Sequence, residues 1–166
     1  MSFRNRMQLA GGAGLLQLSV PLLDARNEKQ LAKDVKLAGG SWQRDHWRTI
    51  LSCYNRSPWF EYYRDDLAVF YEKQYGFLFD LSLDACRWVE RHLGSSTPIA
   101  LNGKEEAGDD FRNFFRPATR LNWAGEAEMV GPYNQVFRER NGFIPGLSIL
   151  DLLFCEGPAA RKWLVS

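Results

Sequence analysis

Two arginines lie two positions apart near the start of the chain. Arg4 and Arg6 flank Asn5 in a segment whose alternating side-chain character predicts a β-strand. Because side chains two residues apart leave a strand on the same face, both guanidinium groups could hold one phosphate or carboxylate. The same spacing suits an ordinary solvated strand face, and the spacing alone leaves both interpretations open.

A histidine on an apolar helix face is the first candidate general base. The residues from Ser41 onward follow steps of three and four, and this period puts His46 beside Trp42 and Ile50. A partly desolvated imidazole can titrate near neutral pH and accept a proton, although a histidine in this setting is more often a satisfied core residue. The other histidine, His92, lies near a predicted helix C-terminus, where the helix dipole accounts for it.

Two acidic residues near the C-terminus could also take part in catalysis. Asp151 follows Ser148 by three residues, which equally explains it as a first-turn acid behind a helix cap. Glu156 lies near the end of the same predicted helix, where the dipole disfavours a negative charge. Glu156 therefore needs either a partner or a function.

The familiar catalytic motifs are absent from the sequence. It contains no glycine-rich phosphate loop, no Gly-x-Ser-x-Gly and no His-Glu-x-x-His, and the glycine-rich stretch 11–14 is better explained as a turn between two strands. Two distant histidines without spaced cysteine or acidic partners predict no metal site. These absences exclude the common enzyme classes rather than catalysis itself.

Composition and charge restrict the class of protein. The 166 residues fit one domain, with 45% hydrophobic and 25% charged residues as in ordinary globular proteins. The 14% aromatic content favours a compact aromatic core or an aromatic-lined cleft, and composition does not separate the two. The net charge of +1 predicts neither nucleic-acid binding nor attraction to an anionic membrane.

The cysteines and the hydropathy pattern predict a cytoplasmic protein. Cys53, Cys86 and Cys155 are far apart and odd in number, and each lies in an apolar helical context, which suits reduced, buried thiols. No apolar run approaches the roughly 18 residues of a membrane span, and the start lacks the layout of a signal peptide. We therefore expect neither membrane insertion nor secretion, and the sequence does not predict the oligomeric state.

The predicted elements describe a single α+β (or mixed α/β) domain in which a small sheet of N-terminal strands is packed by several helices. A glycine turn joins two strands, a short third strand is possible, and residues 95–131 form a long loop with at most one short strand near Ile99. The predicted strands are 3–9, 15–22 and 33–37, and the predicted helices begin at Ser41, begin at Ser57-Pro58, span 80–93, span 133–141, begin at Ser148 and span 159–164.

Several ordered motifs along the chain resemble the WbqC-like family. They are Phe3-Arg4-Asn5-Arg6, Leu18-Ser19-Val20-Pro21-Leu22, Trp42-x-Arg44-x-His46-Trp47, Tyr54-x-x-Ser57-Pro58-x-Phe60, Tyr133-x-Gln135-Val136-Phe137 and Gly142-Phe143-Ile144-Pro145 with the run from Leu147 to Gly157. Members of that family usually open with a further strand and helix. The resemblance therefore implies that residues 1–166 are one WbqC-like domain lacking its usual N-terminal strand–helix segment.

The resemblance also implies a function. The family is encoded in O-antigen and other surface-polysaccharide gene clusters, and its proposed role is a transferase that modifies a sugar, for example with glycine or another aminoacyl group. No cofactor is predicted beyond a nucleotide-sugar or activated amino-acid co-substrate. The alternative from another class is a non-catalytic sugar- or partner-binding protein of the same pathway. The motif positions give His46, Asp151 and Glu156 as catalytic candidates and Arg4, Asn5, Arg6, Tyr133 and Gln135 as ligand-binding candidates.

Overall fold

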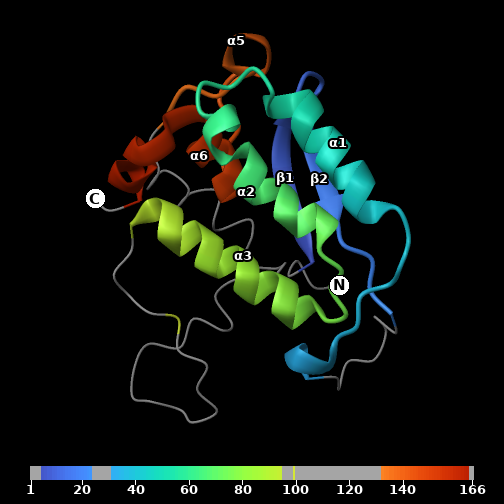
Figure 1. Ribbon diagram of the computed structural model, residues 1–166. Coiled ribbons are helices and arrows are strands. Elements are labelled where there is room, and N and C mark those ends of the chain that lie inside the picture. Colours follow the sequence, from blue (N-terminus) through green and yellow to red (C-terminus); the bar gives the residue numbers. More distant parts are fainter. Residues whose placement is uncertain (1–4, 24–30, 95–98, 100–131, 165–166) are drawn as a thin grey trace.

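In the computed structural model (Figure 1), the described residues are 5–23, 31–94, 99 and 132–164. They form one antiparallel hairpin and a set of helices, which confirms the α+β class. In chain order the elements are β1 (Arg6–Gly11), β2 (Gly14–Ser19), η1 (Ala32–Asp34), α1 (Trp42–Tyr54), α2 (Phe60–Glu72), α3 (Leu78–Leu93), α5 (Arg138–Asn141), α6 (Ile149–Glu156) and η3 (Gly157–Trp163).

The predicted N-terminal hairpin is confirmed. The register runs from the pair Arg6 and Ser19 to the pair Gly11 and Gly14, so two residues make the turn. Gly14 has a φ of 112°, which an L side chain rarely adopts, and this explains the glycine there. Helices α1 and α6 both contact β1, and in Figure 1 they lie on opposite sides of the hairpin.

The predicted third strand at residues 33–37 is wrong. Its first half is the 3-10 helix η1, and its second half makes only isolated bridges, one to Leu22 and one to Phe77. A ladder needs a partner that offers successive donors and acceptors, and Pro21 next to Leu22 has no N–H to donate. The sheet of the described residues therefore has two strands.

Three predicted helix ends are confirmed, two of them together with the expected capping residue. Helix α1 begins directly after Ser41, but the Ser41 hydroxyl donates to the Asp45 carboxylate and makes no capping hydrogen bond. Helix α3 ends at Gly94, which takes the left-handed conformation with a φ of 61°. Ser148 caps α6, because its hydroxyl accepts a hydrogen bond from the Leu150 N–H at 3.4 Å. None of the helices in the described part of the chain is long and apolar enough to cross a membrane.

The predicted start of α2 is wrong by two residues. The sequence predicts a helix that begins at Ser57-Pro58, with Ser57 as its cap, but the Ser57 hydroxyl instead donates to the Tyr54 carbonyl at 2.8 Å and closes the preceding turn. Helix α2 begins at Phe60, and the N–H of the residue before it, Trp59, donates to the Phe154 carbonyl at 3.0 Å. This contact with α6 decides where the helix can start.

The C-terminal elements are shorter or tighter than predicted. The helix expected over 133–141 is reduced to α5, because the residues before it adopt irregular backbone and direct their side chains into buried contacts. The final helix is the 3-10 helix η3. The loop expected over 95–131 lies outside the described residues except for Ile99.

The core lies where α1, α2, α6 and β1 meet, and it is largely aromatic. The ring of Phe154 lies 5.1 Å from the ring of Tyr54, 5.1 Å from that of Phe60 and 6.3 Å from that of Tyr63, measured between centroids. Aromatic pairs at such distances add about 0.5–1.5 kcal/mol each beyond the area they bury. One of the two alternatives left open by the aromatic composition, a compact aromatic core, is therefore present.

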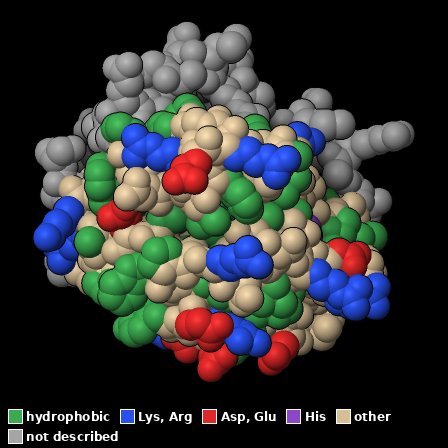
Figure 2. Space-filling model, turned by 90° about the horizontal axis from the view of Figure 1, so that it is seen from above, with side chains coloured by type: hydrophobic (Ala, Val, Ile, Leu, Met, Phe, Trp, Pro, Cys, Tyr) green, Lys and Arg blue, Asp and Glu red, His purple; other side chains and the backbone are tan. Residues whose placement is uncertain are grey.

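The surface carries mixed charge. Figure 2 shows basic, acidic and apolar side chains interspersed over the face seen from above. This distribution agrees with the net charge of +1 and provides no one-signed field on that face for a polyanion.

Candidate functional site

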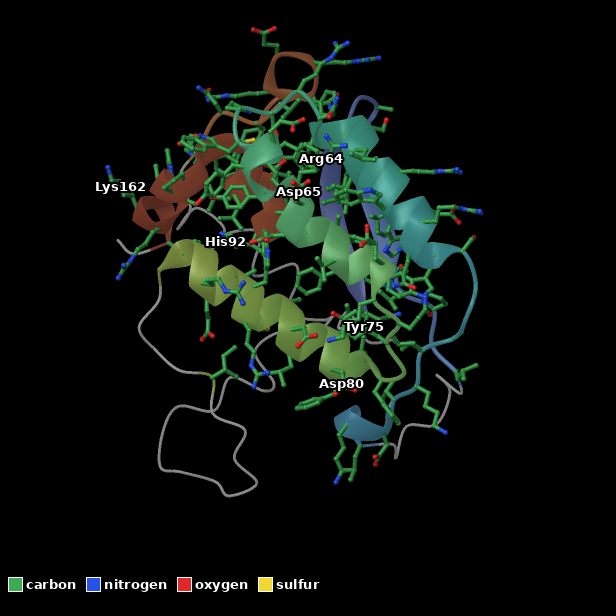
Figure 3. The ribbon with its side chains drawn as sticks, in the orientation of Figure 1. Arg64, Asp65, Tyr75, Asp80, His92 and Lys162 are labelled. Atoms are coloured by element: carbon green, nitrogen blue, oxygen red, sulfur yellow. The ribbon has the colours of Figure 1, made fainter. Side chains whose placement is uncertain are left out.

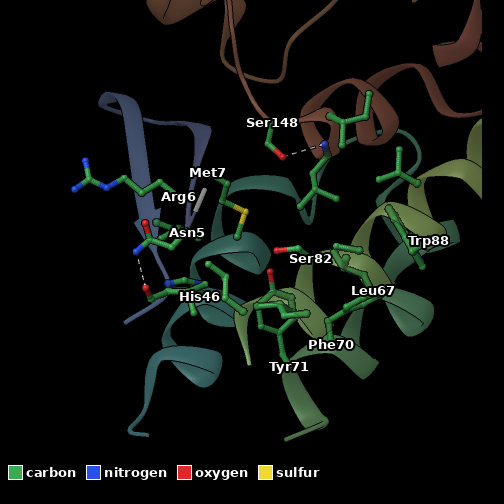
Figure 4. A pocket seen from close by; sticks show the side chains of 18 of the residues that line it. Asn5, Arg6, Met7, His46, Leu67, Phe70, Tyr71, Ser82, Trp88 and Ser148 are labelled. Carbon is green, nitrogen blue, oxygen red and sulfur yellow. Dashed lines mark hydrogen bonds between the residues drawn. The ribbon is translucent and has the colours of Figure 1, made fainter. Parts of the chain in front are cut away.

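A pocket of about 240 Å³ opens beside the hairpin (Figure 4). The start of β1, the end of β2, helices α1, α2 and α3, and the start of α6 all contribute to its wall. The rings of Phe70, Tyr71 and Trp88 and aliphatic side chains such as Leu67 make most of the lining. The second alternative from the aromatic composition, an aromatic-lined cavity, is therefore present as well.

Three of the predicted site residues meet in this pocket, namely Asn5, Arg6 and His46. The Asn5 side chain donates from Nδ2 to the Val20 carbonyl at 2.8 Å, while the Val20 N–H donates to the Asn5 carbonyl at 2.8 Å. These bonds extend the hairpin by one pair and hold its open end at the pocket. Arg4, the other half of the predicted clamp, lies outside the described residues.

His46 combines deep burial with an unsatisfied nitrogen. The residue is 6% exposed, its ring packs edge-on against Trp42 at 5.2 Å between centroids, and its Nδ1 atom is buried with no hydrogen-bond partner among the described residues. Burial lowers the pKa of His46, and the Ser19 carbonyl and the Asp45 carboxylate oppose this shift. The imidazole is therefore neutral at neutral pH.

The tautomer of His46 follows from its surroundings. The Ser19 carbonyl can only accept a hydrogen bond, and no described residue bonds to Nδ1, so we infer that Nε2 carries the proton and faces this carbonyl. The lone pair is then on Nδ1. A neutral imidazole with a free lone pair in a pocket wall has the chemistry of a general base.

Other predicted site residues assemble away from the pocket, around a buried carboxylate. Asp151 is 0% exposed. Its Oδ1 accepts a hydrogen bond from the Tyr54 hydroxyl at 2.7 Å, and its Oδ2 accepts one from the Tyr133 hydroxyl at 2.6 Å. The Tyr54 oxygen in turn accepts a hydrogen bond from the Ala10 N–H at 3.0 Å, which connects the carboxylate to β1.

Gln135 completes this network through two hydrogen bonds to the backbone of Ile144. Its Nε2 donates to the Ile144 carbonyl at 2.8 Å, and its Oε1 accepts from the Ile144 N–H at 2.8 Å. The same Nε2 lies 3.4 Å from the Tyr133 hydroxyl oxygen and donates to it weakly. Gln135 and Tyr133, predicted as ligand-binding residues, therefore use their polar atoms in hydrogen bonds within the protein.

The pKa shifts in this network have clear causes. Burial raises the pKa of Asp151, and the hydrogen bonds from Tyr133, Tyr54 and Gln135 act against that shift. Burial and then the neighbouring carboxylate raise the pKa of both Tyr54 and Tyr133. Both phenols stay protonated at neutral pH and serve as donors to the carboxylate.

The network around Asp151 connects three of the elements that line the pocket. Tyr54 belongs to α1, Asp151 to α6 and Ala10 to β1, and each of these three elements also lines the pocket, through His46, Leu150 and Met7 or their neighbours. Asp151 itself is closed off from the pocket opening by its 0% exposure. Tyr54 belongs to one of the family motifs but was not among the predicted site residues. A tyrosine on an apolar helix face needs a hydroxyl partner, and this requirement was the available signal.

Glu156 has the partner that its position near a helix end required. The indole N–H of Trp163 donates to Glu156 Oε2 at 3.3 Å. The carboxylate thus connects the end of α6 to η3. It does not line the pocket.

His92 lies behind one wall of the pocket. It extends from α3 toward α2 (Figure 3), with its ring 4.4 Å from that of Trp88 and 4.9 Å from that of Tyr63. Burial lowers the pKa of His92, and the Asp66 carboxylate, 3.5 Å from Nε2, raises it in part. His92 does not line the pocket, so its contacts are those of a packing residue. In the described part of the chain, no group of three or more histidine, cysteine or acidic side chains could hold a metal ion.

Comparisons with known proteins identify similar sequences. The family model described as "WbqC-like protein family" matches residues 1–110, a range that contains Asn5, Arg6 and His46. The "Uncharacterized protein Rv1507c" of Mycobacterium tuberculosis is 26% identical over 191 aligned residues, which cover 98% of this chain and 81% of that protein. No solved structure matches the chain significantly.

Proposed function

This chain belongs to the WbqC-like protein family, and from this membership and the pocket at His46 we propose that it is a cytoplasmic transferase that modifies a sugar during O-antigen or other surface-polysaccharide biosynthesis. The three cysteines are all unpaired, which suits a reducing compartment, although Cys86 is exposed and not buried as expected. The acceptor is a nucleotide-linked or lipid-linked sugar. The donor is an activated acyl or aminoacyl group.

The observation that carries this proposal is the state of His46. It is a neutral imidazole in a pocket wall, and its Nδ1 has no hydrogen-bond partner in the part of the chain that the structure describes. Nδ1 is closed to water in the free protein, and the χ2 torsion of histidine is soft enough for the ring to turn it toward a bound substrate. In the reaction Nδ1 takes the proton of the attacking hydroxyl or amine, and the proton then passes to the leaving group of the donor.

Arg6 supplies the positive charge of the site. It is an exposed residue at the start of β1, where it lines the pocket next to Asn5. A guanidinium group has five N–H donors, so it can hold a phosphate or carboxylate in addition to other contacts. We assign Arg6, together with Arg4, to the anionic group of the donor or acceptor.

The size of the pocket limits which part of the substrate enters it. Its volume of about 240 Å³ lies below the roughly 300–1,000 Å³ of pockets that enclose drug-sized ligands. A whole nucleotide-linked sugar exceeds this space. One sugar ring or one transferred group therefore occupies the pocket, and the nucleotide or lipid carrier remains outside.

The test is a pH–rate profile with two histidine variants. Turnover is measured by mass spectrometry as mass added to UDP-N-acetylglucosamine or UDP-galactose, with acyl and glycyl thioesters as donors. A general base contributes about 100- to 10,000-fold, so His46→Gln should lower kcat by at least about 100-fold and remove the fall in rate at acid pH. Gln retains a donor toward the Ser19 carbonyl.

His92→Gln is the matched control, because His92 is the other histidine and does not line the pocket. It should keep the acid limb of the profile and most of the activity. An unchanged profile in His46→Gln would remove His46 from the mechanism.

A second function has a specific observation in its favour. The aromatic rings of the pocket suit stacking on a sugar, and His46 Nδ1 is closed to water in the free protein. Both features fit a non-catalytic protein that binds a sugar or a partner of the same pathway. Stabilisation of the protein by a nucleotide sugar in a thermal-shift assay, without turnover of any donor, would favour this alternative.

A further inference from the structure

We infer that the pocket binds the hydrocarbon chain of an acyl group that is presented as a thioester, rather than a glycyl or other aminoacyl group. This inference rests on the proposed transferase function and specifies the transferred group. Three properties of the pocket carry it, namely the charge, the distribution of polarity and the volume.

The charge of the wall disfavours an amino acid. Among the described residues that line the pocket there is no aspartate or glutamate, and the one side chain with a full charge is Arg6. The α-ammonium group of an aminoacyl donor would lose its water without gaining a counter-charge, and it would lie near a guanidinium of the same sign. A neutral acyl chain does not meet this penalty.

The polarity of the wall changes from one side to the other (Figure 4). Asn5, Arg6 and His46 lie together on the side of the hairpin and α1. The opposite side, made by α2 and α3, is largely apolar, with residues such as Phe70 and Trp88, and its polar groups are the neutral hydroxyls of Tyr71 and Ser82 and the indole N–H of Trp88. A ligand that matches this arrangement has a polar carbonyl end at the hairpin and a hydrocarbon chain between α2 and α3. Burial of that chain is favourable because it removes apolar surface from water.

The volume sets the length of the chain. At about 30 Å³ per water molecule in the liquid, a pocket of about 240 Å³ has the size of roughly eight waters. It can therefore hold an acyl chain of roughly six to eight carbon atoms. A long fatty acyl chain would leave its end outside.

The chemical step balances without an oxidant or a reductant. The sugar hydroxyl gives its proton to His46 Nδ1, and its oxygen forms a bond to the thioester carbonyl carbon. The carbon–sulfur bond then breaks, and the leaving thiolate takes the proton from His46. The products are an acylated sugar and a free thiol.

The test is a binding series on the full chain by isothermal titration calorimetry, with acetate, butyrate, hexanoate, octanoate and dodecanoate as probes. Burial of one methylene predicts a Kd about fourfold lower for each added carbon up to six to eight carbons, followed by a plateau. Octylamine and glycine should bind at least about tenfold more weakly than octanoate. Equal binding of octylamine, or no dependence on chain length, would overturn the inference.

Two neighbouring residues of α3 offer a matched pair of variants. Ala85 lines the pocket, whereas Cys86 is exposed and does not. Ala85→Phe should fill the cavity and weaken octanoate binding at least tenfold, while Cys86→Phe should leave it unchanged. Equal affinities in the two variants would place the octanoate elsewhere. If Ala85→Phe does not fold, the chain-length series on the unaltered protein decides the question.

The outcomes separate this inference from the proposed function. Octanoate binding without transfer from octanoyl thioester to any sugar would support the pocket assignment and remove the transferase. Transfer from a glycyl thioester, without octanoate binding, would keep the transferase and overturn the acyl assignment.

Discussion

The two tyrosines that hold Asp151 should differ in their contribution to stability, although their hydrogen bonds to the carboxylate are nearly equal in length. The distances are 2.7 Å from Tyr54 and 2.6 Å from Tyr133. Tyr54 also accepts a hydrogen bond from the Ala10 N–H, and Ala10 is 1% exposed. Tyr54→Phe therefore leaves a buried backbone donor without a partner, and Tyr133→Phe does not.

The magnitudes follow from these contacts. A hydrogen bond to a charged group contributes about 1.5–3 kcal/mol, and an unsatisfied buried donor costs about 1–3 kcal/mol. We expect Tyr133→Phe to lower the free energy of unfolding by about 1.5–3 kcal/mol and Tyr54→Phe by about 2.5–6 kcal/mol. Gln135 does not add to the cost of Tyr133→Phe, because its side chain keeps both bonds to Ile144.

The assay is urea unfolding at pH 7, followed by tryptophan fluorescence. The dependence of the unfolding free energy on urea concentration is compared between the variants to verify that both unfold in the same way. Equal losses in the two variants would refute the reasoning, because the Ala10 N–H would then contribute nothing. A larger loss for Tyr133→Phe would refute it as well.

The same network predicts a dependence on pH. Burial raises the pKa of Asp151 in the folded state, so the folded protein binds more protons than the unfolded protein between the ordinary pKa and the raised one. The contribution of this group to stability is therefore full below its ordinary pKa and is lost as the pH rises through the folded-state pKa. Losing a donor raises that pKa further, so the cost of Tyr54→Phe should be smaller at pH 4 than at pH 7.

Two further predictions concern the histidines and one glycine. Burial lowers the pKa of both His46 and His92 in the folded protein. Below about pH 6.5 the unfolded state therefore binds more protons than the folded state, and the free energy of unfolding should fall as the pH is lowered from 7.5 to 5.5. His46→Gln and His92→Gln should each reduce this dependence of the unfolding free energy on pH, measured by urea unfolding at each pH. An unchanged pH dependence in both variants would contradict the prediction. Gly157→Ala should cost about 2–4 kcal/mol, because Gly157 has a φ of 57° and a Cβ there would lie 2.2 Å from the Trp59 ring. Gly76→Ala, which meets no atom within 4 Å, should change thermal stability by less than about 0.5 kcal/mol, and similar losses in both glycine variants would contradict the steric argument.

Local features of the chain were predictable where their causes lie within a few residues. The hairpin depends on a two-residue turn followed directly by Gly14 at a positive φ, and the end of α3 depends on Gly94. The start of α6 depends on the Ser148 side chain and a backbone N–H two residues later. Each of these contacts is short in sequence, so residue type and spacing were sufficient.

Local patterns failed where a distant contact competed with them. Ser57 has the type and spacing of a helix cap, but α2 begins later because the backbone before it is bonded to Phe154. The segment 33–37 has the composition of a strand, but a strand exists only when a partner pairs with it along several residues. In both cases the deciding partner is remote in the chain.

In the candidate site, too, some features were predictable from the sequence and others depend on the tertiary structure. The sequence by itself determined the α+β class, the hairpin, the start of α1, the end of α3, the start of α6 and a set of residue types able to bind anions or accept protons. Only the tertiary structure decided that Asn5, Arg6 and His46 share a pocket while Asp151 is enclosed by Tyr54 and Tyr133. The physical reason is that burial and hydrogen-bond partners depend on which elements pack together, and the bond between Tyr54 and Asp151 joins residues 97 positions apart.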